Sequence, residues 1–176
     1  MRIKGIKNES FSDYKLPSMY IAFPHCSFKC DRENNQKLCQ NSHLAQVKEE
    51  EVDIDTIINL YLTNPLTQAI VFAGLEPLDS QEDVIDFLEA FRIKYQRNDP
   101  IIIYTGYTET ELENGEWGIS NNSPEQQSQV WDQIKNYNLI VKFGRYLPDQ
   151  KPHYDKMLGV ELASNNQYAK EFINEN

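Results

Sequence analysis

The stretch "QAIVFAGLEPLDSQEDVIDFLEAFRIKY", residues 68–95, decides the fold class. Its first seven residues are almost continuously apolar, which is typical of a strand covered on both faces of a parallel sheet. Residues 79–95 follow with the periodicity of an amphipathic helix, and Asp79 and Glu82 have the spacing of a capping box. The apolar stripe of this helix is Val84, Phe87, Leu88 and Phe91.

Similar units lie on both sides of this strand–helix pair. Further strands are predicted at 18–23, 100–106 and 138–144, helices at 53–62, 123–137 and 166–176, and a short extended piece at 158–163. This alternation predicts an α/β fold with right-handed parallel connections. About five strands are too few to close an eight-stranded barrel. We therefore expect an open, partial (β/α) barrel with a mostly parallel sheet of about five strands.

Composition favours a single domain over residues 1–176, with 40% hydrophobic residues to build its core. No apolar run is long enough to cross a membrane, and the N-terminal "MRIKGIKNES" lacks the apolar segment of a signal peptide. We therefore expect a cytoplasmic protein. The net charge of −10 makes nucleic acid an improbable partner, because phosphate binding uses many Lys and Arg side chains.

All three cysteines lie in "FPHCSFKCDRENNQKLCQNSHL", residues 23–44. One interpretation is a structural zinc site, because four residues have the ligand types and the spacing of a Cys3His site: Cys26, Cys30, Cys39 and His43. Such a site would suit a non-enzymatic protein-binding module. The alternative is a [4Fe–4S] cluster held by three thiolates, which leaves one iron open to a small ligand. A thiol redox pair is disfavoured because the close C-x-x-C spacing is absent.

Four unusual segments each follow a predicted strand: the cysteine segment, 73–77, 104–108 and 143–148. In open parallel sheets, ligands bind at the carboxyl ends of the strands. These segments are therefore expected to converge on one site.

A cysteine trio directly after the first strand of such a sheet resembles the radical S-adenosylmethionine enzymes. "FAGLEPL" (72–78) resembles the Gly-Gly-Glu-Pro segment of that family, and "CQNSHL" (39–44) resembles the stretch after the last cluster cysteine in its small activating enzymes. "IIIYTGYTETEL" (101–112), "NLIVKFGRYLPDQKPHYDKMLGV" (138–160) and "LASNNQ" (162–167) are similar to the anaerobic ribonucleotide reductase activases, which are glycyl-radical activating enzymes. The resemblance covers most of residues 18–170.

The chain departs from the family pattern at three places. The family usually has C-x3-C-x2-C, whereas eight residues separate Cys30 from Cys39 here. The residue before the last cysteine is usually aromatic and is Leu38 here, and the second glycine of Gly-Gly-Glu is Leu75.

The resemblance implies a [4Fe–4S] cluster on Cys26, Cys30 and Cys39, with S-adenosylmethionine on the open iron. One electron from a flavodoxin- or ferredoxin-type donor would cleave S-adenosylmethionine to a 5′-deoxyadenosyl radical. That radical would abstract a hydrogen atom from a glycine of a partner glycyl-radical enzyme, such as the large subunit of anaerobic ribonucleotide reductase. No side chain of this chain is assigned a catalytic proton or hydrogen transfer.

The resemblance also implies a set of cofactor-binding residues. Gly74 would let backbone approach the cofactor, Glu76 would face its amino group or sulfonium charge, and Pro77 would hold the loop rigid. Each has a plainer alternative: Gly74 as a turn after a strand, Glu76 as a helix cap, and the residues after the third strand as turn or core. The remaining predicted cofactor-binding residues are Tyr104, Thr105, Gly106, Ser164 and Asn165.

Overall fold

Six strands form the central sheet in this computed structural model, which describes residues 1–174. Their spatial order is β10-β7-β6-β5-β3-β2. The four inner strands pair in parallel, and β2 and β10 pair antiparallel at the two edges. The bounds are β2 Gly5–Ser10, β3 Ser18–Phe23, β5 Ala69–Gly74, β6 Ile101–Tyr104, β7 Leu139–Phe143 and β10 Tyr168–Phe172.

This architecture confirms the α/β class and corrects the expected sheet. The sheet is mixed and has six strands, and within residues 1–174 no pairing joins β10 to β2. It is therefore open, and a barrel is not shown. The two antiparallel edge strands were missed because they contain consecutive polar residues and lack the continuous apolar run of the inner strands.

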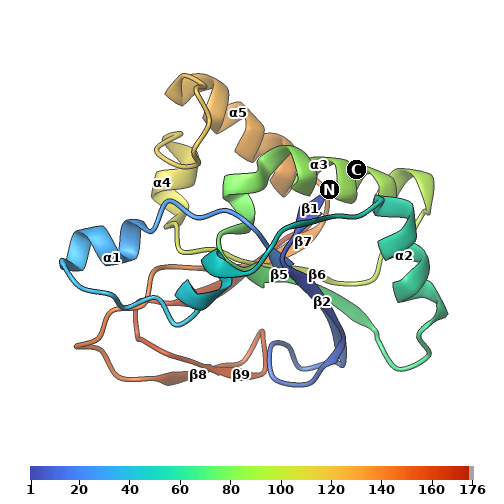
Figure 1. The fold of residues 1–176 in the computed structure, drawn as a ribbon, viewed down its shortest axis with the longest axis horizontal. Coiled ribbons are helices and arrows are strands. Elements are labelled where there is room, and N and C mark those ends of the chain that lie inside the picture. The colour runs from blue at the N-terminus through green and yellow to red at the C-terminus, as the bar shows by residue number, and fades with distance from the viewer. Residues whose placement is uncertain (175–176) are drawn as a thin grey trace.

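The helices gather over one face of the sheet (Figure 1). Because β3, β5, β6 and β7 are neighbours in chain order, every right-handed crossover passes over the same face. The helices are α1 Lys29–Asn34, η1 Ser42–Gln46, α2 Ile54–Thr63, η2 Pro77–Ser80, α3 Gln81–Glu89, the π-helical η3 Ala90–Lys94, α4 Glu109–Glu113 and α5 Pro124–Lys135. Two small ribbons complete the fold, β1 Arg2–Ile3 with β4 Glu50–Glu51, and β8 His153–Asp155 with β9 Val160–Leu162.

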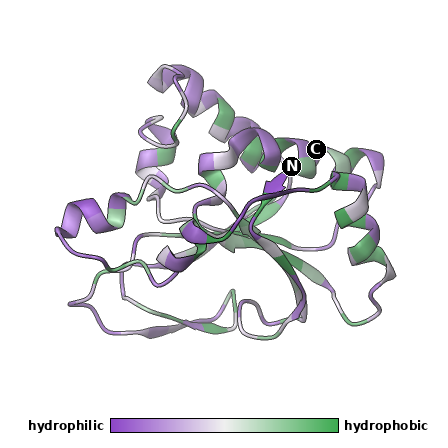
Figure 2. Cartoon of the chain, viewed as in Figure 1, coloured by the Kyte–Doolittle hydropathy of each residue, from purple (hydrophilic) through white to green (hydrophobic). Residues whose placement is uncertain are grey.

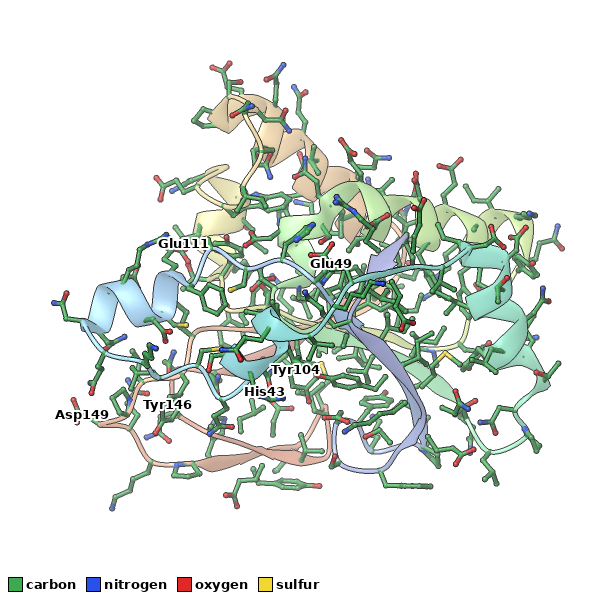
Figure 3. The ribbon with its side chains drawn as sticks, in the orientation of Figure 1. His43, Glu49, Tyr104, Glu111, Tyr146 and Asp149 are labelled. Carbon is green, nitrogen blue, oxygen red and sulfur yellow. The ribbon has the colours of Figure 1, made fainter. Side chains whose placement is uncertain are left out.

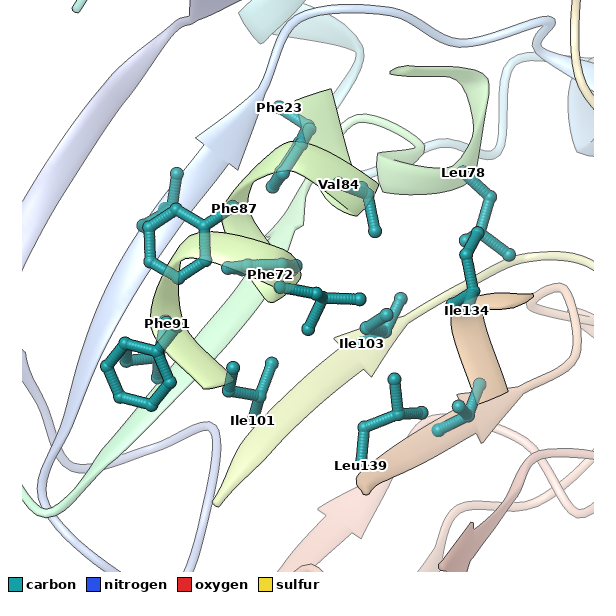
Figure 4. Close-up of a cluster of buried hydrophobic side chains, with 14 of the residues drawn as sticks. Phe23, Phe72, Leu78, Val84, Phe87, Phe91, Ile101, Ile103, Ile134 and Leu139 are labelled. Carbon is teal, nitrogen blue, oxygen red and sulfur yellow. The ribbon is translucent and has the colours of Figure 1, made fainter. Parts of the chain in front are cut away.

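The main core lies between these helices and the sheet (Figure 4). The predicted stripe of α3 and η3 is fully buried there. The Phe72 ring lies 5.1 Å from the rings of both Phe23 and Phe87, which joins two strands to the helix. Apolar residues accordingly concentrate in the strands and on the inner helix faces, with polar residues outside (Figure 2).

The opposite face of the sheet carries smaller side chains, including Ala69, Val71 and Ala73. Tyr14, Leu158 and Leu162 cover it from loops and from the β8–β9 ribbon. The inner strands are thus buried on both faces, as their apolar runs predict. No helix within residues 1–174 has the length and apolar character needed to span a bilayer.

Side chains cap two of the long helices, and one capping box predicted from the sequence does not form. Ser123 and Gln126 form the capping box of α5, and Asp53 accepts a hydrogen bond from Thr56 N at the start of α2. The Asp79–Glu82 box is wrong, because the helical run begins earlier, at Pro77, and Asp79 lies inside it. The carboxylate of Asp79 instead accepts hydrogen bonds from Ser27 N and Tyr107 Oη.

The predicted C-terminal helix at 166–176 is also wrong, as far as residue 174; its last two residues lie outside the described part. Residues 168–172 form strand β10 on the free edge of β7. Tyr168 and Phe172 pack against Phe143, and Phe172 also meets Trp131. Pairing satisfies the edge hydrogen bonds of β7 and brings these rings against Phe143, which outweighs local helix propensity.

Candidate functional site

A cavity of about 350 Å³ opens at the carboxyl ends of the four parallel strands. Eight of the eleven predicted site residues line it: Cys26, Cys30, Cys39, Gly74, Glu76, Tyr104, Thr105 and Gly106. The other three do not. Pro77 is buried in η2, Ser164 is fully buried and accepts a hydrogen bond from Leu147 N, and Asn165 is exposed.

The residues between Cys30 and Cys39 fold back on themselves. The short helix α1 begins at Lys29, just before Cys30, and its last four residues belong to this stretch. Asp31 Oδ1 accepts hydrogen bonds from Leu38 N at 2.9 Å and Cys39 N at 3.0 Å. Asp31 thereby closes the eight residues between Cys30 and Cys39 into a loop and brings the two thiols side by side. The sequence analysis predicted no helix in this segment.

The start of the cysteine segment is anchored to the strand ends by buried polar groups. Asp79 Oδ2 accepts a hydrogen bond from Ser27 N at 2.6 Å, and Asp79 Oδ1 accepts one from Tyr107 Oη at 2.7 Å. Glu76 N donates to His25 O at 2.7 Å. These contacts hold Cys26 beside the end of β5. Asp79 therefore anchors the site. The sequence analysis missed this role because it assigned Asp79 to a helix capping box.

The residues after β6 form the next wall of the cavity. Tyr104, labelled in Figure 3, lines it, and its hydroxyl donates to Asp13 O at 2.5 Å, so the loop before β3 also borders the cavity. Thr105 Oγ1 accepts a hydrogen bond from Tyr107 N. Gly106 N donates to Glu76 Oε2 at 2.8 Å. This hydrogen bond joins the end of β5 directly to the end of β6 at the cavity.

The sequence profile of a family described as a 4Fe-4S single cluster domain matches residues 18–167. The chain belongs to this family. The match runs from the first residue of β3 to the end of the β7–β10 connection, and it contains all three cysteines. A search among curated proteins finds no match. Family membership supports a 4Fe–4S cluster as the cofactor of this chain.

The donor set of this 4Fe–4S domain fits such a cluster. The three thiols are half-buried beside an open cavity, and Phe28 N donates a hydrogen bond to Cys26 Sγ at 3.2 Å. Hydrogen bonds to sulfur stabilise thiolate and tune iron–sulfur clusters. These residues are therefore suited to hold a cluster.

The three thiols differ in acidity in the chain alone. Burial raises the pKa of Cys26 to about 12. A hydrogen bond from Cys30 lowers the pKa of Cys39 to about 7, and the same contact raises the pKa of Cys30. Iron binds thiolate, so cluster assembly must release the Cys26 and Cys30 protons.

The zinc alternative lacks support within residues 1–174. His43 is exposed, its Nδ1 lies 3.2 Å from Gln40 O, and it does not line the cavity. In the same part of the chain no three His, Cys, Asp or Glu side chains are arranged to hold a metal ion. A cluster distributes its thiolates over several irons, so it does not require the three sulfurs to converge on one point.

Glu76 is a buried acidic residue in the lining of the cavity of this 4Fe–4S domain. It is 6% exposed, and its carboxylate accepts hydrogen bonds from Gly106 N and Leu78 N. The contact with Leu78 N caps η2, so the plainer alternative for this residue is confirmed. Burial, reinforced by Asp79, raises the pKa of Glu76 to about 8. A cationic ligand beside this carboxylate would lower that pKa and bind more tightly.

Lys142 is a buried basic residue in the lining of the cavity and was missed by the sequence analysis. It lies on β7 between Val141 and Phe143, and its side chain points to the opposite face from theirs. It is 7% exposed, its ammonium donates to Gly144 O at 2.7 Å, and burial lowers its pKa to about 8. A charged residue at an inward position of a buried strand was the available signal.

Glu76 gives this 4Fe–4S domain a testable pH dependence. Between pH 4.5 and 8 the folded apo chain keeps a proton on Glu76 that the unfolded chain releases, so the free energy of unfolding should fall as pH rises. The fall is about 3–5 kcal/mol, at roughly 1.4 kcal/mol per pKa unit. Urea unfolding of the reduced apo chain at pH 5 and pH 8 measures it.

The Glu76→Gln variant should lose most of this slope, because the amide does not titrate. Glu89→Gln, on the exposed side of α3, is the matched control and should keep the wild-type slope. Equal slopes in wild type and Glu76→Gln would show that another group controls the pH dependence.

Proposed function

We propose that this 4Fe–4S protein is a radical S-adenosylmethionine enzyme. It would cleave S-adenosylmethionine reductively to methionine and a 5′-deoxyadenosyl radical, which takes a hydrogen atom from a glycine of a partner protein. The observation that carries the proposal is the shared cavity, in which three thiols face a buried carboxylate and a buried ammonium.

The charges in the cavity suit the methionine part of this ligand. The α-amino and carboxylate groups of an amino acid form a zwitterion, and Glu76 and Lys142 offer one partner of each sign. Both are largely removed from water, where ionic hydrogen bonds are stronger than at a surface. The cavity volume lies within the range of small-molecule sites.

Cys26, Cys30 and Cys39 would hold the cluster, which leaves one iron for the ligand. When bound, the cluster supplies the single electron that opens the carbon–sulfur bond. Gly106 N would keep Glu76 oriented toward the ligand, and Tyr104 with the loop at Asp13 would border the ligand. The electron would come from a flavodoxin- or ferredoxin-type donor.

The glycyl-radical activases supply the proposed substrate class, since their sequence resemblance extends over four segments of this chain. The hydrogen donor would be a glycyl-radical enzyme of the anaerobic ribonucleotide reductase type. The mouth of the cavity is bordered by α1, the loop after β7 and the β8–β9 ribbon. A protein loop carrying the glycine would enter between these segments.

The test is a reconstitution without oxygen. The chain is loaded with iron and sulfide, its visible spectrum is recorded, and S-adenosylmethionine and a strong reductant are added. We expect a brown protein that forms methionine and 5′-deoxyadenosine. A brown protein that forms neither would support a structural or electron-transfer cluster instead, and a colourless protein with one tightly bound zinc would support the protein-binding module.

A further inference from the structure

Helix α1 is joined to the far wall of the cavity by a network of four charged side chains, which we call the clamp: Lys29, Glu33, Glu111 and Arg145. Arg145 makes a two-pronged pair with Glu111, with Nη1–Oε2 at 2.8 Å and Nη2–Oε1 at 3.0 Å. Its Nε also donates to Glu33 at 2.8 Å, and Lys29 bonds to Glu111. Glu111 stands on α4 above α1 (Figure 3).

The centre of the clamp is shielded from water. The side chain of Glu111 is 11% exposed and that of Arg145 is 15% exposed. Glu111 also accepts a hydrogen bond from Thr108 N in the capping box of α4, so its carboxylate is fixed by two elements. Burial alone would raise its pKa, but hydrogen bonds from Arg145, Lys29 and Thr108 outweigh it and lower the pKa to about 2.

Helix α1 has little else to hold it. It has six residues and none of them is buried, so no apolar side chain anchors it to the core. A helix this short is unstable by itself. The residues that flank it, Phe28 and Asn35, adopt left-handed conformations with φ of 50° and 51°, which is unfavourable for a phenylalanine. Tertiary contacts must therefore impose the position of this segment.

Cys30 lies in α1, and Asp31 ties Cys39 to the same helix. Two of the three thiols therefore move with α1, whereas Cys26 is anchored separately through Ser27 and Asp79. The relative position of the thiols depends on what holds α1. The clamp supplies the ionic contacts from α1 to α4 and to the loop after β7.

We propose that Arg145 and Glu111 are positioning residues that keep Cys30 and Cys39 in place beside Cys26, and so set how firmly the chain retains its cluster. This inference rests on the part of the proposed function that assigns the three cysteines as cluster ligands. Helix α1 thereby acquires a role: Lys29, just before Cys30, and Glu33, within the stretch between Cys30 and Cys39, carry the charges that reach the opposite wall.

The experiment follows the loss of cluster from reconstituted protein to an iron chelator without oxygen. Arg145→Met removes the charge and keeps much of the side-chain length, and Glu111→Gln keeps the shape. Both should release iron about tenfold faster than wild type, as loss of a partly buried charged pair predicts. Lys170→Met, which breaks the more exposed Lys170–Glu109 pair, is the matched control and should release iron at the wild-type rate.

Two further readouts separate positioning from general destabilisation. Hydrogen exchange of the Leu38 and Cys39 amides in the apo chain should accelerate in Arg145→Met, whereas exchange in β5 and β6 should not. High salt should speed iron release from wild type more than from Arg145→Met, because the variant has already lost the Arg145 ion pairs that salt would screen.

Unchanged iron release in both variants would overturn the inference, and so would exchange that accelerates equally in the sheet. A protein that assembles a cluster but does not cleave S-adenosylmethionine would refute the proposed function and leave the clamp result standing. Wild-type protein that assembles no cluster would overturn both.

Discussion

Replacing Cys26, Cys30 or Cys39 with alanine is expected to reduce the iron and sulfide bound after reconstitution to below about a tenth of wild type. All three thiols line the same cavity. Helix α1, which carries Cys30, has no buried side chain to fix its position, so two remaining thiolates are not expected to hold a cluster. The 5′-deoxyadenosine yield should fall to the level of the protein-free control. Iron and sulfide analysis with the visible spectrum measures the first effect, and chromatography measures the second.

His43→Ala is the control for these variants. The exposed imidazole lies outside the cavity, so iron content and deoxyadenosine yield should both stay at wild-type values. A zinc site would respond differently, since loss of His43 would then weaken metal binding as much as loss of a cysteine. Turnover retained in Cys39→Ala would show that the third ligand is misassigned.

Gly74→Ala is expected to destabilise the fold by about 3 kcal/mol or more. Gly74 ends β5 with φ of 89°, which L-residues rarely adopt. An added Cβ would lie 2.8 Å from Ala22 Cα and 2.9 Å from Phe23 N, both backbone atoms of the paired strand β3. The strands would have to separate at the point where the cysteine segment begins. Urea unfolding of the apo chain measures the loss.

Gly106→Ala is the matched control for stability, because it is another glycine of the same cavity. Its added Cβ would meet Arg145 Cγ at 3.3 Å, a flexible side chain, and the cost should stay below about 1 kcal/mol. Equal stabilities for the two variants would show that β3 and β5 can separate at little cost. The comparison also tests the plainer explanation of Gly74 as a turn after a strand. Under that explanation the fold itself requires glycine here, even with no cofactor bound.

The inner strands and the long helices were predictable because local patterns report burial. Strands β3, β5, β6 and β7 carry apolar runs since both their faces are covered, and α3 shows its buried stripe. The edge strands carried no such pattern. Strand β10 exists because β7 has a free edge and because Tyr168 and Phe172 find Phe143 there. Neither partner is visible within residues 168–172 alone.

The candidate site divides in the same way. Clustering marked the three cysteines, and the strand ends marked Gly74 and Glu76, because these signals are local in the chain. Asp79 and Arg145 were missed, since each acquires its role from a distant residue: Asp79 from Ser27, Arg145 from Glu33 and Glu111. Lys142 was missed although its place in the buried strand β7 was a local signal. Ser164 and Asn165 were expected at the cofactor, and neither lines the cavity.

The amino-acid sequence by itself determined the α/β class, the order of the buried strands and the identity of the thiols, because periodicity and clustering are properties of neighbouring residues. Tertiary structure alone decided the antiparallel edges, the charges that face each other across the cavity and the position of α1. A six-residue helix without a buried side chain has no preferred place of its own. Its place follows from ion pairs with residues more than 80 and 110 positions away in the chain.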